Sequence, residues 1–128
     1  MPVTCDDLVA FGEGLGTTAS ETDLRAAISR AYYGAYHHSL IWESQLPELG
    51  HEIGPAGGIH QKLLNRLQNP GALCSVDKKL KSRSLSYRLK QLKIERTEAD
   101  YNLVTKITDA SATMSIANAR KLLTDFPV

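Results

Sequence analysis

Arg30 and His37 are the two residues of this chain whose types and spacing point most clearly to chemistry. They lie seven positions apart in a strongly helical segment, residues 29–38. At about 100° per residue, seven steps bring His37 to within roughly 20° of Arg30, about two turns further along the axis. A guanidinium fits phosphate oxygens and an imidazole transfers protons near neutral pH. The pair therefore suits phosphodiester chemistry.

The same spacing also arises on an ordinary amphipathic helix, on which Arg30 pairs with a carboxylate such as Glu98 or Asp100. Side chains about 10 Å apart along a helix axis do not touch each other. A cleft between two copies of the helix, in contrast, brings four such groups together. His38 lies about 100° around the helix from His37 and so offers the same chemistry on another face.

The length of 128 residues allows one core, so we expect a single domain over residues 1–128. Fifteen Lys and Arg against fourteen Asp and Glu leave a net charge of +1, which neither favours nor excludes a nucleic-acid partner. Two separate cysteines without a Cys/His cluster favour a reducing compartment, and we expect no metal and no cofactor. The sequence shows no signal peptide and no apolar run near the roughly 20 residues of a membrane span. We therefore expect a cytoplasmic protein without a membrane contact.

Apolar residues recur at helical spacing in five places, and strand patterns are weak throughout. The sequence therefore predicts an all-α domain of five helices. Thr4 with Asp7 and Ser20 with Asp23 resemble capping boxes at the first two helix starts. The predicted helices cover residues 5 to about 12–16, about 21–45, about 77–96 and about 108–125, with a break after residue 96 around 100–102. A further helix, third in order, begins near residues 58–60 and is ended by residues 69–71.

The second predicted helix is apolar on two sides, which is typical of a central helix. It presents more apolar surface than we expect a five-helix monomer to cover, which predicts a dimer interface on this helix. The face of Arg30 and His37 lies about 120–140° from the first apolar stripe and should meet solvent or another subunit. The two stripes are Leu24, Ile28, Ala31, Ala35 and Trp42, and Tyr32, Tyr36 and Leu40.

The fourth predicted helix is strongly basic. Residues 78–96 contain eight Lys and Arg and one acid, Glu95, with Leu85, Leu89 and Leu92 as the expected inward stripe. Such a face contacts phosphates or is simply solvated, and its imbalance favours phosphate contacts. The residues expected to contact an RNA backbone are Lys78, Lys79, Lys81, Arg83 and Arg88.

Three tyrosines and a second histidine have two interpretations each. Tyr32, Tyr33 and Tyr36 could stack on bases, but closely spaced tyrosines on a central helix more often belong to a core or an interface. His60, at the start of the third helix, is expected to cap or pack. His51, in a loop rich in Gly and Pro, is uninformative.

Three parts of the chain together resemble the HEPN family. They are the run Ser29-Arg30-Ala31-Tyr32-Tyr33 through Tyr36-His37, the third helix that begins at His60, and the run Arg96-Thr97-Glu98-Ala99-Asp100-Tyr101. The resemblance implies a five-helix up-and-down bundle that dimerises. In active members of the family it implies a metal-independent ribonuclease whose site forms across the dimer.

On the family pattern, Arg30 stabilises the phosphate and His37 moves protons between the 2′-hydroxyl and the leaving oxygen, giving a 2′,3′-cyclic phosphate. The family motif usually has a polar residue directly after the arginine, where this chain has Ala31. The motif also usually lies on a late helix, whereas Arg30 lies on the second predicted helix. Further residues that the resemblance assigns to a supporting role are Tyr33, His38, Arg96, Asp100 and Tyr101.

The resemblance implies two functions of different classes. The first is an RNA-directed endoribonuclease of a toxin–antitoxin or antiviral defence system, acting as a homodimer, with a nucleotidyltransferase-type antitoxin as partner. The alternative is a non-catalytic HEPN module that docks a partner nucleotidyltransferase or binds a nucleotide or RNA.

Overall fold

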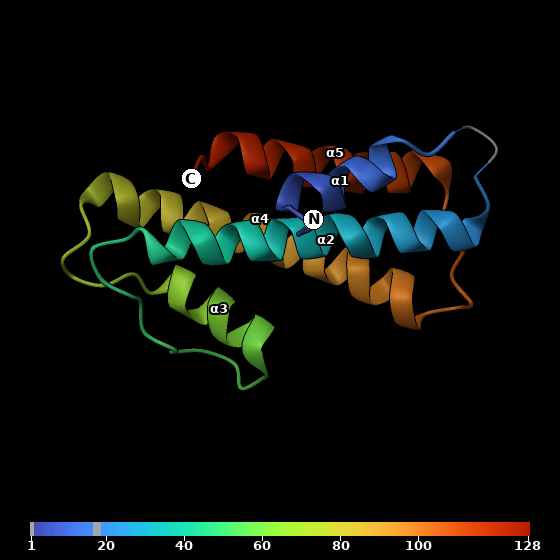
Figure 1. The fold of residues 1–128 in the computed structure, drawn as a ribbon. Helices are drawn as coiled ribbons and strands as arrows, with labels where there is room; N and C mark the ends of the chain where they lie inside the picture. Colours follow the sequence, from blue (N-terminus) through green and yellow to red (C-terminus); the bar gives the residue numbers. More distant parts are fainter. Residues whose placement is uncertain (1, 17–18) are drawn as a thin grey trace.

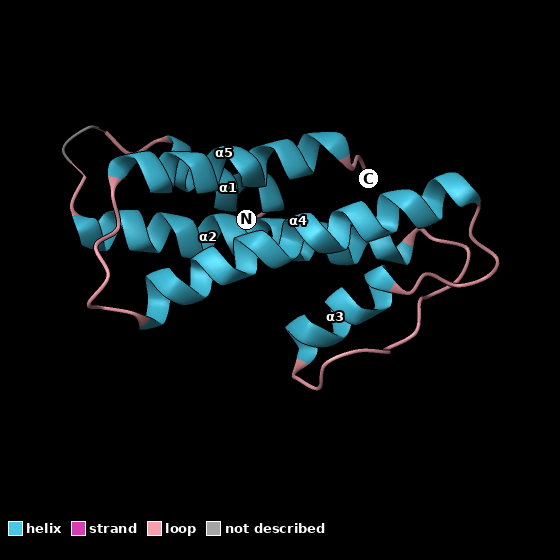
Figure 2. Ribbon diagram, turned by 180° about the vertical axis from the view of Figure 1, so that it is seen from behind, coloured by secondary structure: helices cyan, strands magenta, loops and turns pink. Residues whose placement is uncertain are grey.

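Five α-helices form the framework of the chain in a computed structural model that describes residues 2–16 and 19–128 (Figure 1). They are α1 (Cys5–Glu13), α2 (Glu21–Ser44), α3 (Ile59–Gln68), α4 (Val76–Tyr101) and α5 (Asp109–Asp125). The described residues contain no strand (Figure 2). The prediction of an all-α fold with five helices is therefore confirmed.

Helix α2 lies at the centre and contacts each of the other four helices. In Figure 1, α1 and α5 lie along one side of α2, α4 crosses behind it, and α3 lies below. The segment 45–58 carries the chain back beneath α2, so α3 runs in the same general direction as α2 (Figure 1). Successive helices thus do not alternate in direction at this point, and the start of α3 comes to lie beside the middle of α2.

The first two helices begin at the predicted capping boxes. The Thr4 hydroxyl accepts a hydrogen bond from the Asp7 N–H (3.0 Å), and the Asp7 carboxylate accepts one from the Thr4 N–H (2.9 Å). Ser20 and Asp23 repeat this exchange, with 3.2 Å for each bond. Both pairs satisfy N–H groups that a helix leaves free at its start, which explains why the sequence predicts these boundaries well.

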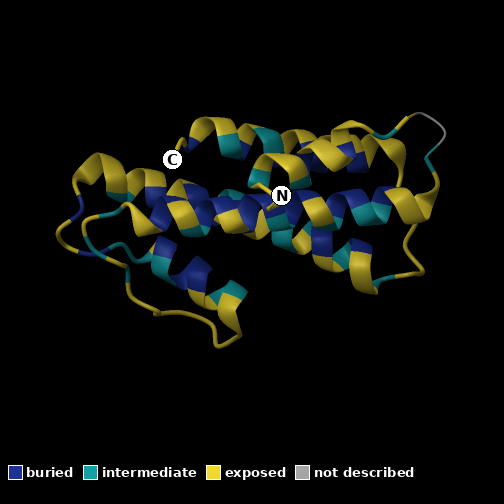
Figure 3. Cartoon of the chain, in the orientation of Figure 1, coloured by how far each residue is buried: buried dark blue, intermediate teal, exposed yellow. Residues whose placement is uncertain are grey.

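The core follows α2, as the dark band along that helix in Figure 3 shows. Within both predicted stripes of α2, every residue except the half-buried Leu40 is buried, and so are Leu85, Leu89 and Leu92 of α4. The expectation that α2 leaves an apolar surface for a dimer is wrong in its premise. The monomer covers both apolar stripes because α1, α3, α4 and α5 all pack against α2.

Helix α4 continues five residues beyond its predicted end at Arg96, and Asn102 caps it. The reason is tertiary. Ala99, in the added turn, is buried in a small core cluster with Leu24 and Ile28 of α2 and with Ile107 and Ala112. Burial of this turn stabilises helical residues whose local sequence alone does not specify them.

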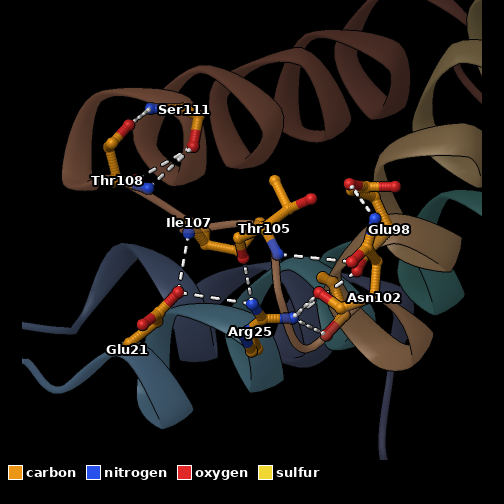
Figure 4. A network of polar contacts seen from close by, with 9 residues as sticks. Glu21, Arg25, Glu98, Asn102, Thr105, Ile107, Thr108 and Ser111 are labelled. Atoms are coloured by element: carbon orange, nitrogen blue, oxygen red, sulfur yellow. Dashed lines mark hydrogen bonds and ion pairs between the residues drawn. The ribbon is translucent and has the colours of Figure 1, made fainter.

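Arg25 binds backbone carbonyl groups at the C-terminal end of α4 (Figure 4). The last carbonyls of a helix have no helical partner, and the Arg25 guanidinium binds them. Glu21 accepts a hydrogen bond from Arg25 (3.3 Å) and another from the Ile107 N–H (2.7 Å), which fixes the segment that leads to α5. The backbone carbonyls that accept from Arg25 are those of Glu98 (3.5 Å), Ala99 (2.8 Å), Asn102 (3.0 Å) and Thr105.

Candidate functional site

His60, the second residue of α3, packs against the tyrosines of α2. Its Nδ1 lies 2.7 Å from the Tyr32 hydroxyl oxygen, and its ring centroid lies 4.2 Å from that of Tyr36. Tyr33 meets the same imidazole edge-on at 5.9 Å. The expectation that His60 packs is confirmed, and the packing fixes the position of its ring.

The surroundings also bear on the protonation of His60. Burial raises the pKa of Tyr32 well above its ordinary value, so its hydroxyl stays protonated, and we assign it as the donor to His60 Nδ1. The remaining imidazole proton is then assigned to Nε2. Burial lowers the pKa of His60, and three basic groups lower it further, those of Arg96, Lys93 and His37. His60 is therefore a neutral hydrogen-bond donor at pH 7.

His37 is exposed and lies beside this arrangement. Its ring meets that of Tyr36 edge-on, with centroids 5.2 Å apart, and is tilted against Tyr33 at 6.5 Å. The prediction that this face of α2 points away from the core is confirmed for His37. An imidazole that is exposed to solvent can exchange protons with a bound substrate.

Arg30 is also exposed, but the structure does not bring it to His37. Its guanidinium carbon lies 5.6 Å from the centroid of the Phe11 ring of α1. In the part of the chain that the structure describes, no hydrogen bond or ion pair joins Arg30 to Glu98 or Asp100, so the alternative pairing from the sequence is wrong. Arg30 and His37 share a helix face, yet each has its own aromatic neighbour.

Arg96 joins α4 to the tyrosines of α2. The residue is 8% exposed, and its guanidinium carbon lies 5.1 Å from the Tyr32 ring centroid and 5.7 Å from that of Tyr33. Asp100 accepts from the Ser29 hydroxyl (3.2 Å) and lies 3.5 Å from Arg96. The buried Nε of Arg96 has no partner among the described residues. The two sequence runs of the HEPN resemblance are thus in direct contact.

Lys93 adds a further cation beside His60. Its Nζ donates to Gln61 Oε1 (3.4 Å). Burial lowers its pKa, and the charges of Arg96 and Lys90 lower it further. Lys90 and Lys93 line a groove of about 350 Å³ between α3 and α4, and neither forms an ion pair within residues 2–16 and 19–128. The groups that converge here are named the basic cluster below: His37, His60, Lys93 and Arg96.

The five basic residues predicted to contact RNA lie outside the basic cluster, and most of them bind their own chain. Arg88 pairs with Asp125 (2.9 Å), and its guanidinium carbon lies 5.3 Å from the Phe126 ring centroid. Lys79 is half-buried. The other contacts join Lys78 to the Trp42 ring (5.5 Å to its centroid), Lys81 to Asp77 (3.5 Å) and Arg83 to the Gln68 carbonyl oxygen (3.4 Å).

Two residues assigned to a supporting role have other positions. His38 is buried, and its Nε2 lies 2.6 Å from the Phe126 carbonyl oxygen, which holds the end of the chain against α2. Its supporting role at the site is therefore wrong, because its ring faces the core. Tyr101, the last residue of α4, is 74% exposed and lies apart from the tyrosines of α2.

Sequence reasoning underrated His60 and Lys93, which come from different helices. A histidine in the first turn of α3 and a lysine in α4 carry no spacing signal toward each other. The feature that brings them together is segment 45–58, which leads the chain back beneath α2 to the start of α3 (Figure 1). The sequence indicated only that this segment is a loop.

The described residues hold no group of three or more His, Cys, Asp or Glu arranged for a metal ion. None of the described helices has the length and apolar character of a membrane span. A comparison with known proteins found no matching family model, no matching curated protein and no matching solved structure. The HEPN resemblance remains a prediction from the motifs.

Proposed function

We propose that this chain acts on RNA as a metal-independent endoribonuclease of the HEPN kind, with its site at the basic cluster. The observation that supports this proposal is the convergence of basic groups from three helices beside tyrosine rings. Asp100 is the carboxylate that contacts one of them, Arg96. Phosphates are the natural counterions of such a surface, and aromatic rings stack on unpaired bases.

In the proposed reaction, the ribose 2′-hydroxyl oxygen attacks the adjacent phosphorus atom. The bond from phosphorus to the 5′-oxygen of the next nucleotide breaks. His37 accepts the proton of the 2′-hydroxyl, and the imidazolium that forms gives this proton to the leaving 5′-oxygen. The products are a 2′,3′-cyclic phosphate and a 5′-hydroxyl end.

Two further groups stabilise the negative charge that builds on the phosphate. Lys93 supplies a cation, and the Nε2–H of neutral His60 supplies a hydrogen bond that needs no change of protonation state. Arg30 has this role in the family pattern. Its guanidinium lies on the Phe11 side of α2, so its contribution is tested separately below.

The setting of this proposal rests on the resemblance alone. In that setting the protein acts as a homodimer in a toxin–antitoxin or antiviral defence system, with a nucleotidyltransferase-type antitoxin as partner. The second candidate is a non-catalytic HEPN module that binds RNA or docks such a partner. It is favoured by one observation, namely that Arg30 contacts Phe11 rather than His37.

The test is cleavage of a single-stranded RNA by the purified protein in the presence of EDTA, followed on a denaturing gel. His37→Ala should lower the cleavage rate by about 10² to 10⁴, which is the usual contribution of general acid–base catalysis. Arg30→Ala should lower it less than His37→Ala, because Arg30 lies beside Phe11. Mass spectrometry of the products should find 2′,3′-cyclic phosphate ends.

His51→Ala is the matched control, because His51 is an exposed histidine of the 45–58 segment. It should leave the rate unchanged, whereas the buried His38 is unsuitable as a control. Absence of cleavage by the wild type, together with RNA binding, would replace the nuclease by the binding module. Cleavage that His37→Ala leaves intact would remove His37 from the site.

A further inference from the structure

A second hollow lies between the C-terminal half of α4 and the start of α5, and it shares Ile94 and Glu98 with the groove beside the basic cluster. It is a groove of about 420 Å³ with Ile28 and Ile107 among its lining residues. Ile94 and Met114 also line it and are 52% and 63% exposed. Large apolar side chains gathered at one hollow mark an interaction surface more often than chance exposure does.

The segment between α4 and α5 extends this apolar surface. Leu103 and Val104 are 77% and 96% exposed and directly precede Thr105, which lines the groove. The Arg25 network holds this segment, since Arg25 binds the carbonyls of Asn102 and Thr105 (Figure 4). The exposed side chains are therefore presented on a fixed backbone.

Charges of opposite sign lie on the two walls of the groove. Glu95 and Glu98 belong to the α4 wall, and Lys106 belongs to the wall formed by the connecting segment. The Oε1 atom of Glu95 is buried and has no hydrogen-bond partner among the described residues. A buried carboxylate oxygen without a donor is costly, so this wall is suited to receive a cation from outside the chain.

We propose that a second copy of this chain docks in this groove, with the two-fold axis along the groove. A two-fold interface places each patch against the same patch of the other copy. With the axis in this direction, the α4 wall of one copy faces the Lys106 wall of the other. Each Glu95 then meets a lysine of the second copy, and the apolar side chains of the two patches meet between them.

The inference deepens the homodimer part of the proposed function and assigns that dimer to α4 and α5 instead of α2. The occupant is a second copy because one groove supplies both the acid and the base that such a pairing needs. A stable interface of this kind usually buries about 600 Å² or more per partner. The exposed Leu103 and Val104 supply apolar surface beyond the groove itself.

The experiment measures the mass in solution by sedimentation velocity, with the full chain at about 50 µM, a concentration in the range of moderate dimer affinities. The wild type should sediment as a dimer, and Met114→Glu should sediment as a monomer. Val104→Glu should weaken the dimer as well, and its nearly full exposure protects the fold. Circular dichroism should show the same helix content in all variants.

Two matched controls carry the same change on other exposed apolar residues. Leu80→Glu lies near the other end of α4, and Ile41→Glu lies on α2. Both should remain dimers. A charge exchange sharpens the test, because Glu95→Lys and Lys106→Glu should each weaken the dimer and their combination should restore it.

Three outcomes overturn the inference in different ways. A monomeric wild type contradicts both the homodimer and this interface. The ribonuclease proposal is then tested by the RNA cleavage assay alone. A dimer that Ile41→Glu dissociates, while Met114→Glu does not, returns the interface to α2. A dimer that no variant dissociates places the second copy on another face.

Discussion

Two regions of this molecule place positive side chains against α4, and they differ in how completely those charges are satisfied. At the end of α4, Arg25 donates to four backbone carbonyls and to Glu21. Among the described residues, Lys93 of the basic cluster has one amide partner, and the buried Nε of Arg96 has no acceptor. The first region is complete within one chain, whereas the second is short of acceptors.

The difference separates a structural role from a functional one. A buried cation whose donors all have partners stabilises the fold, and nothing further needs to bind there. Besides burial, the charges of Arg96 and Lys90 lower the pKa of Lys93, and such repulsion between neighbouring cations raises the free energy of the unliganded protein. An anion relieves that repulsion, so the basic cluster is the better candidate for a binding site.

The largest effect that we expect is on stability, at Arg25. Arg25→Ala removes five hydrogen bonds of a mostly buried guanidinium, among them those to the Glu98 and Ala99 carbonyls of α4. The free energy of unfolding should fall by about 2 to 4 kcal/mol, which urea denaturation measures. RNA affinity, measured where the variant is still folded, should not change.

Arg120→Ala is the matched control for Arg25→Ala. Arg120 also makes several ion-pair contacts, with Asp6 and Glu13, but these contacts are near the surface. Its loss should cost less than about 1 kcal/mol. Equal losses of stability for the two variants would contradict the structural role given to the Arg25 network.

The next effect is on RNA binding, at the groove between α3 and α4. Replacing Lys90 and Lys93 together by Glu should weaken binding of a single-stranded RNA about tenfold or more at low salt. The slope of log affinity against log salt should flatten by about 0.7 for each lost phosphate contact. Fluorescence anisotropy over a range of salt concentrations measures both quantities.

The control for the lysine pair lies on the same helix. The double change of Lys78 and Lys81 to Glu alters the net charge equally, but those lysines contact Trp42 and Asp77. It should weaken RNA binding less. If both pairs weaken it alike, the whole basic face of α4 binds phosphates, as the sequence predicted, and the basic cluster has no special role.

The smallest effect is a pH dependence at His60. Its pKa is lowered in the folded chain, so the unfolded chain binds the proton more readily. The stability that follows from this difference is present above the ordinary histidine pKa of about 6.5 and is lost as the pH falls below it. Between about pH 7.5 and pH 5.5, the Tm of the wild type should therefore fall more than that of His60→Gln.

His51→Gln serves as the reference for this titration, because His51 is exposed. Its Tm should follow the wild type at every pH. An unchanged pH profile in His60→Gln would mean that burial and the neighbouring basic groups do not hold the imidazole neutral. The difference between the Arg25 network and the basic cluster would then depend on Lys90, Lys93 and Arg96, without His60.

Much of the fold could be predicted from local residue patterns. The capping boxes at Thr4 and Ser20 set two helix starts, because the hydrogen bonds that decide them span only three residues. The stripe Leu85, Leu89 and Leu92 is buried as predicted, since helical spacing alone puts these residues on one face. The end of α4 was predicted five residues early because burial of Ala99 against α2 decides it.

The site was predicted less completely than the fold. The exposure of His37 follows from its angle around α2, but the neighbours of Arg30 do not, since Phe11 comes from another helix. Position around a helix indicates which side chains share a face. It does not indicate which neighbouring helix covers that face.

The sequence by itself determined the five helices, most of their boundaries, the central place of α2 and the outward direction of His37. These depend on hydrogen bonds and side-chain periodicities within a few residues of each other. Only the tertiary structure decided that His60, Lys93 and Arg96 meet beside α2, and that Arg25 binds the last carbonyls of α4 in addition to the Asn102 cap. Such contacts join residues up to 80 positions apart, and their formation depends on how whole helices pack.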